Sequence, residues 1–353
     1  MRYLLLYLTL FLSVGTPVSA NEGEGVDVKE IVLGHMADAY EWHITTIGGK
    51  HISIPLPVIV RSEATGEWHA FSSSHIVEAA HEGKDYKGFF LNEEKNGKIY
   101  ERMPDDSSVR PWDISITKSV LQIWIVVAIM LAVFLGCARW YKRHDATKDA
   151  PKGFVGAVEM LVMTIHDDLI KDSIGEKHYK PYAPYLLTAF FFILITNLLG
   201  LLPIFPGGAN VTGNINITFF LALCTMLAIN LFGNKEYWKE IFWPDVPAFL
   251  KAYPVAIMPV IEVFGIITKP FALMVRLFAN MMAGHAIILS FTAIIFIGWS
   301  LNAALGSGLT LLSFVMMLFM NCLEFLVAFI QAYVFTMLSA VFIGLAHPEH
   351  EHH

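Results

Sequence analysis

The chain has 353 residues, of which 55% are hydrophobic and only 16% are charged. An average soluble domain carries about 25% charged residues, so this composition excludes a disordered chain and a collagen-like rod. The formal net charge of −7 excludes the basic surface that is typical of a nucleic-acid-binding protein. Cys137, Cys224 and Cys322 each lie within an apolar run, so no disulfide framework is predicted.

The first twenty residues have the features of a secretory signal peptide. Arg2 supplies the positive start, an apolar core runs to Val14, and Ala20 ends a small-residue cleavage site. The alternative is a first transmembrane helix, but the apolar core is shorter than the roughly 20 residues that a spanning helix needs. Cleavage would place residue 21 and those after it outside the cytoplasm.

Residues 21–116 form a polar segment with seventeen acidic residues against nine lysines and arginines. The stretch from His51 to Val60 alternates as a strand does, although its two prolines predict an edge or irregular strand. Lys95–Lys98 predicts a turn between two further short strands. The six histidines of this segment show no metal-ligand spacing, and no catalytic constellation appears. We expect a small, mostly β extracytoplasmic region without a metal or cofactor.

Three apolar blocks, at about 119–138, 184–204 and 215–232, are each long enough to cross a bilayer as a helix. Arg139, Lys142 and Arg143 follow the first block, and the positive-inside bias places that end in the cytoplasm. Between the first two blocks, residues 152–180 carry apolar residues at steps of three and four. This period predicts an amphipathic helix, either on the cytoplasmic membrane surface or as an ordinary connector.

Two longer apolar stretches, at about 254–297 and 309–346, flank a glycine-rich segment that predicts a turn. As single helices they would extend roughly 66 and 57 Å, about twice the thickness of a bilayer core. They are therefore predicted to be tilted or bent, with Pro259 and Pro270 as bending points. The predicted fold is an all-α polytopic membrane protein of about five membrane helices, the last two a long tilted hairpin, plus the β region. Residues 347–353 form a His-rich tail that is expected to be solvated, with metal binding as the alternative.

Between residues 271 and 346, Arg276, His285 and Glu324 are the readily charged side chains. A charged residue inside a bilayer is costly and marks function by default. Arg276 shares one helical stripe with three alanines, at 272, 279 and 283, which let a neighbouring helix approach closely. The pattern favours an arginine that faces a partner of opposite charge. The alternatives are an arginine that snorkels to the membrane surface, and alanines that merely pack the protein's own hairpin.

His285 lies nine residues after Arg276, which puts the two side chains on opposite sides of a helix. If Arg276 faces outward, His285 faces inward and is able to meet Glu324 across the hairpin. Such a pair serves either as a proton relay, because histidine titrates near neutral pH, or as a static ion pair. Gln331 lies seven residues after Glu324, on the same helical face. Glu262 lies two steps of seven residues before Arg276, so it is close to the same face as Arg276.

The run from Arg276 to His285 (RLFANMMAGH), preceded by Lys269-Pro270, resembles subunit a of the F-type ATP synthase. Gln331-Ala332-Tyr333-Val334-Phe335 in the last stretch strengthens the resemblance, which covers residues 117–346. It implies the membrane stator of the Fo motor, in the bacterial inner membrane. The implied partners are a ring of c subunits, b-type peripheral stalk subunits and the rest of the synthase. The implied N-terminal region is extracytoplasmic and the C-terminus is cytoplasmic.

The resemblance also implies roles for individual residues. Arg276 matches the family's essential arginine, and Gln331 matches a glutamine packed near it. His285 and Glu324 are exchanged relative to many members, which have an acid and a histidine at these two positions. Lower-ranking matches to the family's half-channels are Glu262, Asn280, Asn214 and Asn216. The chain is not expected to be an enzyme on its own, and the sequence contains no G-x-x-x-x-G-K-[ST] phosphate loop.

Two other classes of protein also use charges inside the membrane. An independent secondary transporter should show an internal inverted repeat, and none is visible in the sequence. An intramembrane protease should carry a zinc-binding His-Glu-x-x-His motif or a G-x-S-x-G element, and the sequence has neither. The secondary transporter remains the alternative function.

Overall fold

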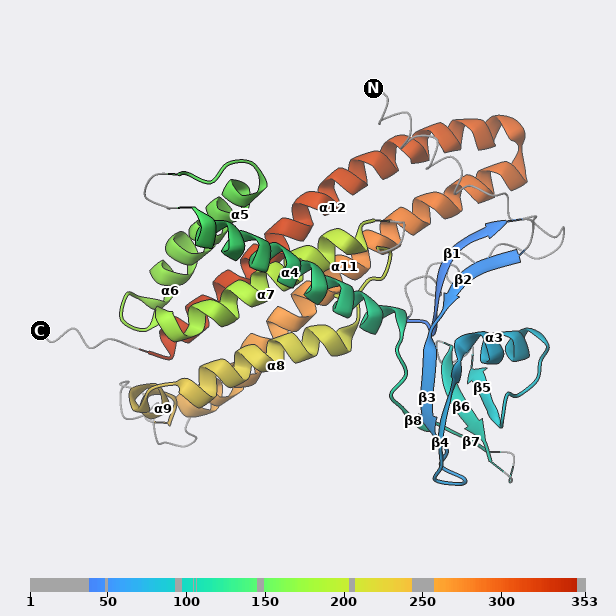
Figure 1. Cartoon of the computed structure of the whole chain (residues 1–353), viewed down its shortest axis with the longest axis horizontal. Coiled ribbons are helices and arrows are strands. Elements are labelled where there is room, and N and C mark those ends of the chain that lie inside the picture. Colours follow the sequence, from blue (N-terminus) through green and yellow to red (C-terminus); the bar gives the residue numbers. More distant parts are fainter. Residues whose placement is uncertain are drawn as a thin grey trace, which may run out of the picture. The chain divides into compact units, whose positions relative to one another are not determined.

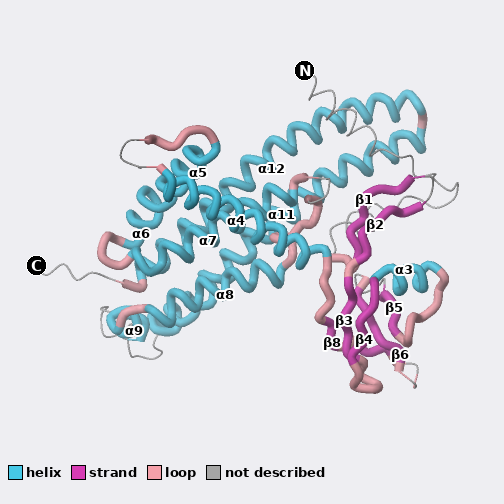
Figure 2. Tube along the Cα trace, in the orientation of Figure 1, coloured by secondary structure: helices cyan, strands magenta, loops and turns pink. Residues whose placement is uncertain are grey.

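The computed structural model describes residues 38–47, 50–92, 97–103, 105, 107–144, 149–202, 207–242 and 257–347. The predicted signal peptide at 1–20 lies outside these residues. The described chain has a β region followed by long helices, which confirms the predicted fold class (Figure 1, Figure 2). The β region, the start of the first long helix and the tip of the last hairpin belong to one compact unit, and the remaining helices form a second.

The β region contains three small antiparallel sheets. The first pairs β1 (Glu41–Ile47) with β2 (Lys50–Pro55), and the second has the order β4-β3-β8. The strands of the second sheet are β3 (Pro57–Arg61), β4 (Trp68–Ser72) and β8 (Trp112–Asp113). The third sheet, in the order β5-β6-β7, is built from β5 (Phe89–Asn92), β6 (Lys98–Arg102) and β7 (Ser108–Val109). Helix α3 (Ser73–His81) follows β4 directly.

The two prolines have a different effect from the one predicted. One strand ends at Pro55 and the next begins at Pro57, and β3 is the middle strand of its sheet rather than an edge. Because Pro57 is the first residue of β3, its missing N–H costs the ladder little. Val58 and Val60 point to the buried side of this strand and pack with Ile76 of α3 in the core of the region.

Five described helices are long and apolar enough to cross a membrane. The first is α4 (Lys118–Arg143), in which the basic residues after the apolar block extend the helix instead of ending it. The next two are α7 (Tyr179–Gly200) and α8 (Ile215–Phe232), and the last two are α11 (Ile257–Leu301) and α12 (Ala303–Leu345). Their polar neighbours are the short helix α9 (Lys235–Phe242) and the segment before α7.

The segment before α7 is helical, but it is not the uniform amphipathic helix that the period predicts. It runs as α5 (Phe154–Met163), a π-helical segment (Thr164–Lys171) and α6 (Asp172–Ile174). The wider π turn brings Ile165, Leu169 and Ile170 to the buried side together. The second half of the segment therefore packs into the helical core beside α7, whereas Phe154 at its start remains exposed.

The last hairpin is tighter than predicted. Asn302 alone separates α11 from α12, and the three glycines of the predicted turn lie inside the helices. A Cβ on Gly298 would lie 3.3 Å from the Gly306 Cα, and one on Gly306 would lie 2.8 Å from the Trp299 ring. These two glycines thus allow two helices to touch at the tip, and they do not form the turn. Helix α11 continues through Pro270.

The start of the His-rich tail is also different from the expectation. His347 is buried, its Nε2 lies 3.2 Å from the Tyr182 hydroxyl of α7, and its Nδ1 lies 3.0 Å from the Ile343 carbonyl oxygen. It therefore belongs to the helical core and not to a solvated tail. Residues 348–353 lie outside the described part of the chain.

Candidate functional site

Arg276 lies on the outer side of α11. Leu273 and Leu277, on the inner side, are buried, whereas Arg276 and its three alanine neighbours at 272, 279 and 283 are exposed. The small side chains leave the guanidinium on an open helical stripe. Among the residues that the structure describes, no carboxylate lies within ion-pair distance of Arg276. The chain therefore supplies this cation with no counter-ion from its described part.

Arg276 lies far from both ends of α11. It lies nineteen residues after Ile257 and twenty-five residues before Leu301 in one continuous helix. At 1.5 Å per residue these separations are about 29 Å and 38 Å. Both exceed the reach of an arginine side chain by far, so the guanidinium cannot extend to either end of the helix.

His285 and Glu324 meet across the hairpin, as their spacing predicts. The His285 Nδ1 lies 3.9 Å from the Glu324 Oε1. Glu324 is only 8% exposed, and neither of its carboxyl oxygens has a hydrogen-bond partner within the described structure. A buried acid without hydrogen bonds is costly as an anion. Among the described residues, His285 is the basic side chain within ion-pair distance of this acid.

Three acceptor oxygens surround the His285 ring. Besides Glu324, the Met281 carbonyl oxygen lies 3.2 Å from Nδ1 and the Gly200 carbonyl oxygen lies 3.3 Å from Nε2. A neutral imidazole carries one N–H, and a protonated ring carries two. Acceptors at both nitrogens suit a ring that holds a proton on each of them. The ring therefore has a carbonyl acceptor at each nitrogen and lies beside a carboxyl group.

Gly284 makes the close packing of Glu324 possible. A Cβ at this position would lie 2.0 Å from the Glu324 Oε1 and 2.9 Å from its Cδ. Any side chain at position 284 would displace the carboxyl group. The glycine next to His285 thus fixes the place of the acid opposite it.

Asn197 and Thr212 extend the polar site beyond the residues that the sequence indicated. The Thr212 hydroxyl donates to the Asn197 Oδ1 at 2.7 Å, and the Asn197 Nδ2 donates to the Ala328 carbonyl oxygen at 3.5 Å. Both side chains are fully buried. Ala328 lies one turn after Glu324 on α12, and Gly200 lies one turn after Asn197 on α7. These contacts gather polar groups of α7, α11 and α12 in one place.

A second buried polar line joins α7, α8 and α12. The Tyr185 hydroxyl lies 2.9 Å from the Thr225 Oγ1, which lies 3.4 Å from the Ser339 Oγ. Sequence reasoning missed this line as well. The available signal was a set of hydroxyl side chains inside the membrane spans. This signal is weak, because such side chains are common in helices, where they bond to the backbone of their own helix.

Within the described residues, no hydrogen bond or ion pair joins the other predicted residues to this cluster. Gln331 is buried on α12, and Asn280 is exposed on the outer half of α11. Asn214 caps α8 by accepting from the Asn216 backbone N–H at 3.1 Å. Within the described residues, no hydrogen bond joins Asn214 or Asn216 to His285 or Glu324. Their local role is to start a helix.

Glu262 lies near the start of α11, close enough to Tyr237 of α9 for an electrostatic interaction. Burial, and then the nearby Glu262 carboxylate, raise the pKa of the Tyr237 phenol in α9. The Tyr237 hydroxyl donates to the Asn230 Oδ1 at 3.2 Å. Glu262 therefore belongs to a second polar group of residues, distinct from the cluster around Glu324.

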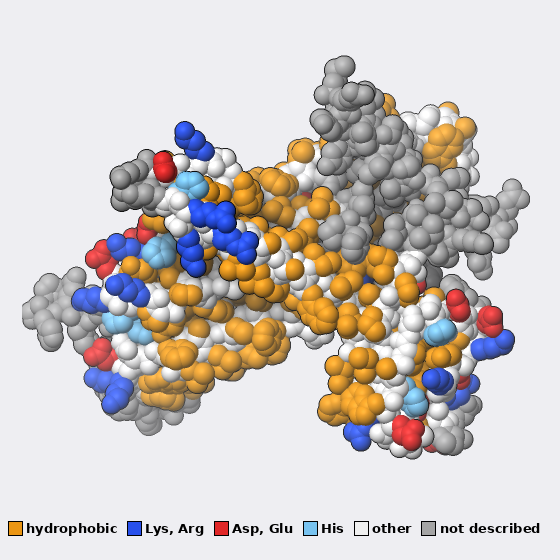
Figure 3. Space-filling view, viewed as in Figure 1, with side chains coloured by type: hydrophobic (Ala, Val, Ile, Leu, Met, Phe, Trp, Pro, Cys, Tyr) orange, Lys and Arg blue, Asp and Glu red, His pale blue; other side chains and the backbone are white. Residues whose placement is uncertain are grey.

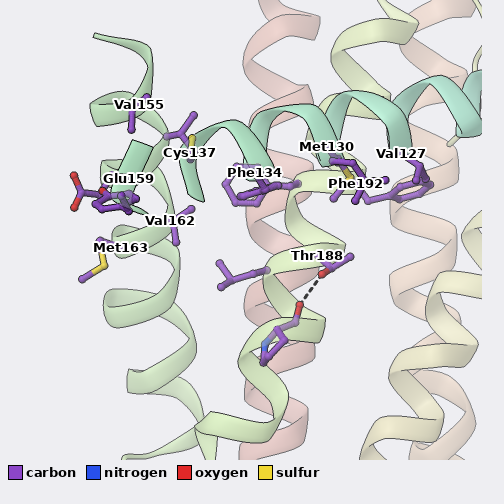
Figure 4. A pocket seen from close by; sticks show the side chains of 16 residues that line it. Val127, Met130, Phe134, Cys137, Val155, Glu159, Val162, Met163, Thr188 and Phe192 are labelled. Carbon is purple, nitrogen blue, oxygen red and sulfur yellow. Dashed lines mark hydrogen bonds between the residues drawn. The ribbon is translucent and has the colours of Figure 1, made fainter. Parts of the chain in front are cut away.

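An apolar groove of about 770 Å³ runs between α4, α5 and α7 (Figure 4). Met130, Phe134 and Cys137 of α4 line it, together with Val158 and Val162 of α5 and Phe191 and Phe192 of α7. None of the charged residues of α11 or α12 lines it. In the space-filling view, lysines and arginines gather over the nearby end of α4, away from the hydrophobic surface of the long helices (Figure 3).

Comparison with known proteins gives two matches to family models. One described as ATP synthase A chain matches residues 120–344, and a domain of unknown function matches residues 31–114. A protein of Chlorobium phaeobacteroides named ATP synthase subunit a is 42% identical over 319 residues, which is 87% of each chain. ATP synthase subunit a 2 of Chlorobium luteolum is 37% identical over 345 residues, covering 98% of this chain and 92% of that protein.

A more distant relative extends the similarity beyond that genus. ATP synthase subunit a of Anaeromyxobacter dehalogenans is 36% identical over 291 residues, covering 80% of this chain and 71% of that protein. The family match includes all five helices that are able to span a membrane. On this likeness and on its spans, the chain is a multi-pass membrane protein that belongs to the ATP synthase A chain family.

Proposed function

We propose that this chain is the membrane stator subunit of a proton-translocating F-type ATP synthase, with Arg276 as the fixed charge that faces a rotating ring of c subunits. The observation that carries the proposal is the exposed, unpaired position of Arg276 on a stripe of alanines near the middle of α11. The chain would act as a subunit of the complex and not as an enzyme by itself.

The physical argument starts from the acid on the ring. A carboxyl group that enters from lipid must be neutral, because a bare charge in hydrocarbon is costly. Beside Arg276 its ionised form is favoured, so it releases its proton there. The guanidinium keeps its charge at every physiological pH. Arg276 thus separates the place where the ring loses protons from the place where it gains them.

Two separate polar groups in the chain supply the two paths. One is the cluster of His285, Glu324 and Asn197, which gathers polar groups of three helices. The other lies around Glu262 at the start of α11. Asn280, Gln331 and the loop with Asn214 and Asn216 complete the proposed lining. Paths that open on opposite sides of the membrane let protons cross only when the ring turns.

The energy needed to make one ATP requires the transfer of several protons. Moving one elementary charge across the membrane yields about 2.3 kcal/mol per 100 mV. Several protons must therefore pass for each ATP that is made. A ring that carries one acid per subunit past a single arginine meets this requirement.

The proposed orientation follows from the first span. Lys142 and Arg143 form the basic last turn of α4, which places that end in the cytoplasm by the positive-inside bias. The β region before α4 is then extracytoplasmic, and five crossings leave the C-terminus in the cytoplasm. Cleavage of the β region in intact spheroplasts by added protease is the expected result, and protection of that region would reverse the orientation.

The groove between α4, α5 and α7 is the proposed contact for a transmembrane helix of a b-type stalk subunit. It is apolar, and it lies on helices that do not carry Arg276. Cys137 lines it and provides a native attachment point for a photo-crosslinker, with the exposed Cys322 of α12 as the matched control. We expect stalk adducts from Cys137 and not from Cys322. Equal stalk adducts from both positions would contradict this assignment.

Substitution of the arginine tests the central claim. In the purified complex, Arg276→Ala is expected to abolish ATP-driven proton pumping in vesicles while the subunit stays in the membrane. Arg139→Ala, at the exposed end of α4, serves as the control that removes a cation elsewhere and is expected to pump normally. Normal pumping by Arg276→Ala would refute the role. Ion transport by the chain alone in liposomes would favour an independent secondary transporter.

A further inference from the structure

The sheet of β4, β3 and β8 has one face on which several large side chains are exposed in the described structure. Val58 and Val60 point to the core, so the alternate residues of β3 point away from it. We call the outer surface the tryptophan face. Its members are Pro57, Ile59 and Arg61 of β3, Trp68 and Ala70 of β4, and Trp112 and Ile114 at β8.

The strand register places two tryptophans on either side of one arginine. Arg61 pairs with Trp68 on one neighbouring strand and with Trp112 on the other. Trp68 is 54% exposed, Trp112 is 67% exposed and Ile114 is 61% exposed. Figure 3 shows hydrophobic side chains gathered on this part of the β region. Large aromatic side chains with so much exposed surface mark an interaction site.

The charge of the tryptophan face is opposite to that of its surroundings. The segment 21–116 has eight more acidic than basic residues. Among the seven residues of the face, Arg61 is the one charged side chain, and its Nε donates to the Gly66 carbonyl oxygen at 3.2 Å. The face thus presents a cation within an acidic region, and this cation is able to approach a phosphate group.

Backbone hydrogen bonds follow the chain from β8 to Lys118, the first residue of α4, and all of these residues belong to the same compact unit. The Ile114 N–H donates to the Ile59 carbonyl oxygen at 3.0 Å, and the Ile116 N–H donates to the Pro57 carbonyl oxygen at 3.1 Å. Two residues later the Lys118 N–H, at the start of α4, donates to Ala39 at 3.0 Å. The segment that connects the sheet to the helix is therefore hydrogen-bonded at every second residue.

The short connection keeps the face near the membrane. Trp112 precedes Lys118 by six residues, which span at most about 20 Å even when fully extended. The sheet therefore stays within about 20 Å of the start of a helix that is able to span a membrane. Tryptophan is enriched at the membrane–water interface because its ring is apolar and its N–H requires a polar partner.

We propose that the tryptophan face rests in the lipid headgroups of the leaflet at which α4 begins. Trp68 and Trp112 insert their rings at the interface, and Arg61 between them binds lipid phosphate. The rest of the acidic region is then directed away from the anionic surface. The inference depends on α4 crossing the membrane and is independent of the role of Arg276.

Spin-label accessibility in the whole complex tests the proposal. The chain's three native cysteines are changed to serine, and Ile114→Cys is labelled with a nitroxide after reconstitution into liposomes. Glu78→Cys, on the exposed side of α3, is the matched control on another surface of the same region. Oxygen concentrates in lipid and a nickel chelate stays in water, so the ratio of their effects reports depth.

A higher oxygen-to-nickel ratio at position 114 than at position 78 is the expected result. Adding Trp68→Ala and Trp112→Ala is expected to lower the ratio at 114 and leave that at 78 unchanged. Equal ratios at the two positions would show a water-exposed face and overturn the proposal. A label at 114 that is shielded from both reagents would show a protein partner and also overturn it. ATP-driven proton pumping by each labelled complex separates a failure here from a failure of the stator assignment.

Discussion

The substitution Gly284→Ala tests whether the position of the Glu324 carboxyl group matters for proton movement. The added Cβ would lie 2.0 Å from the Glu324 Oε1, whereas ordinary contact begins at 3.4 Å. To reach ordinary contact the oxygen must retreat by 1.4 Å, the difference between these two distances. It starts 3.9 Å from the His285 Nδ1, so a retreat on this scale is able to open the pair.

The expected effect is large on transport and small on folding. The atoms that must move belong to the end of a flexible side chain, and alanine favours a helix over glycine by up to about 1 kcal/mol. A misplacement of about 1 Å at a reacting group can cost roughly a hundredfold in rate. We expect Gly284→Ala to reduce ATP-driven proton pumping by about ten- to a hundredfold, with normal amounts of the chain in the complex.

The control and the rescue are available in the same chain. Gly265→Ala, on the same helix, meets nothing closer than the Lys269 Cε at 3.8 Å and is expected to pump normally. Shortening the acid with Glu324→Asp withdraws the carboxyl group by about one bond, or 1.5 Å, and is expected to restore part of the activity of Gly284→Ala. Equal pumping by Gly284→Ala and Gly265→Ala would refute the reasoning.

Three further substitutions test other parts of the structure. Exchanging His285 and Glu324 together should restore more proton pumping than either single change, and equal loss in the double variant would count against a shared relay. Burial and then a carboxylate hydrogen bond raise the pKa of Tyr40. The phenol of Tyr40 therefore ionises at a lower pH in the unfolded chain than in the folded chain, so the β region should lose stability above about pH 10. Tyr40→Phe should remove this loss, as measured by limited proteolysis. Gly344→Ala, whose Cβ would lie 2.3 Å from a backbone oxygen of α6, should destabilise the chain by about 1–3 kcal/mol and reduce its amount in membranes, whereas Gly308→Ala, with nothing within 4 Å, should not.

The positions of the membrane helices were predictable because the bilayer thickness sets their length. The block at 215–232 coincides with α8, and the excess length of the last two stretches predicted a long hairpin. Its tip was predicted wrongly because a glycine marks either a turn or a close approach of two backbones. Gly298 and Gly306 allow a close approach of two backbones, and a single sequence does not distinguish this reason for a glycine from a turn.

The candidate site was predictable only where the helical period decides it. The period separates Arg276 from His285 and brings His285 to Glu324, and the structure has the same arrangement. Asn197 was missed although a carboxamide in an apolar span is a usable signal. Thr212 could not have been found, because its bond to Asn197 depends on how the loop before α8 folds back. The π turn before α7 has no sequence signature that the period reveals.

The geometry of α11 constrains how the two charged groups can work together. Nine residues separate Arg276 from His285, which corresponds to opposite sides of the helix and about 13 Å along its axis. The His285–Glu324 pair therefore lies on the other side of the helix from the guanidinium. Under the proposed function, a ring carboxylate is the counter-ion of Arg276. The separation would then let one helix hold a charge toward a moving partner while its other side passes protons.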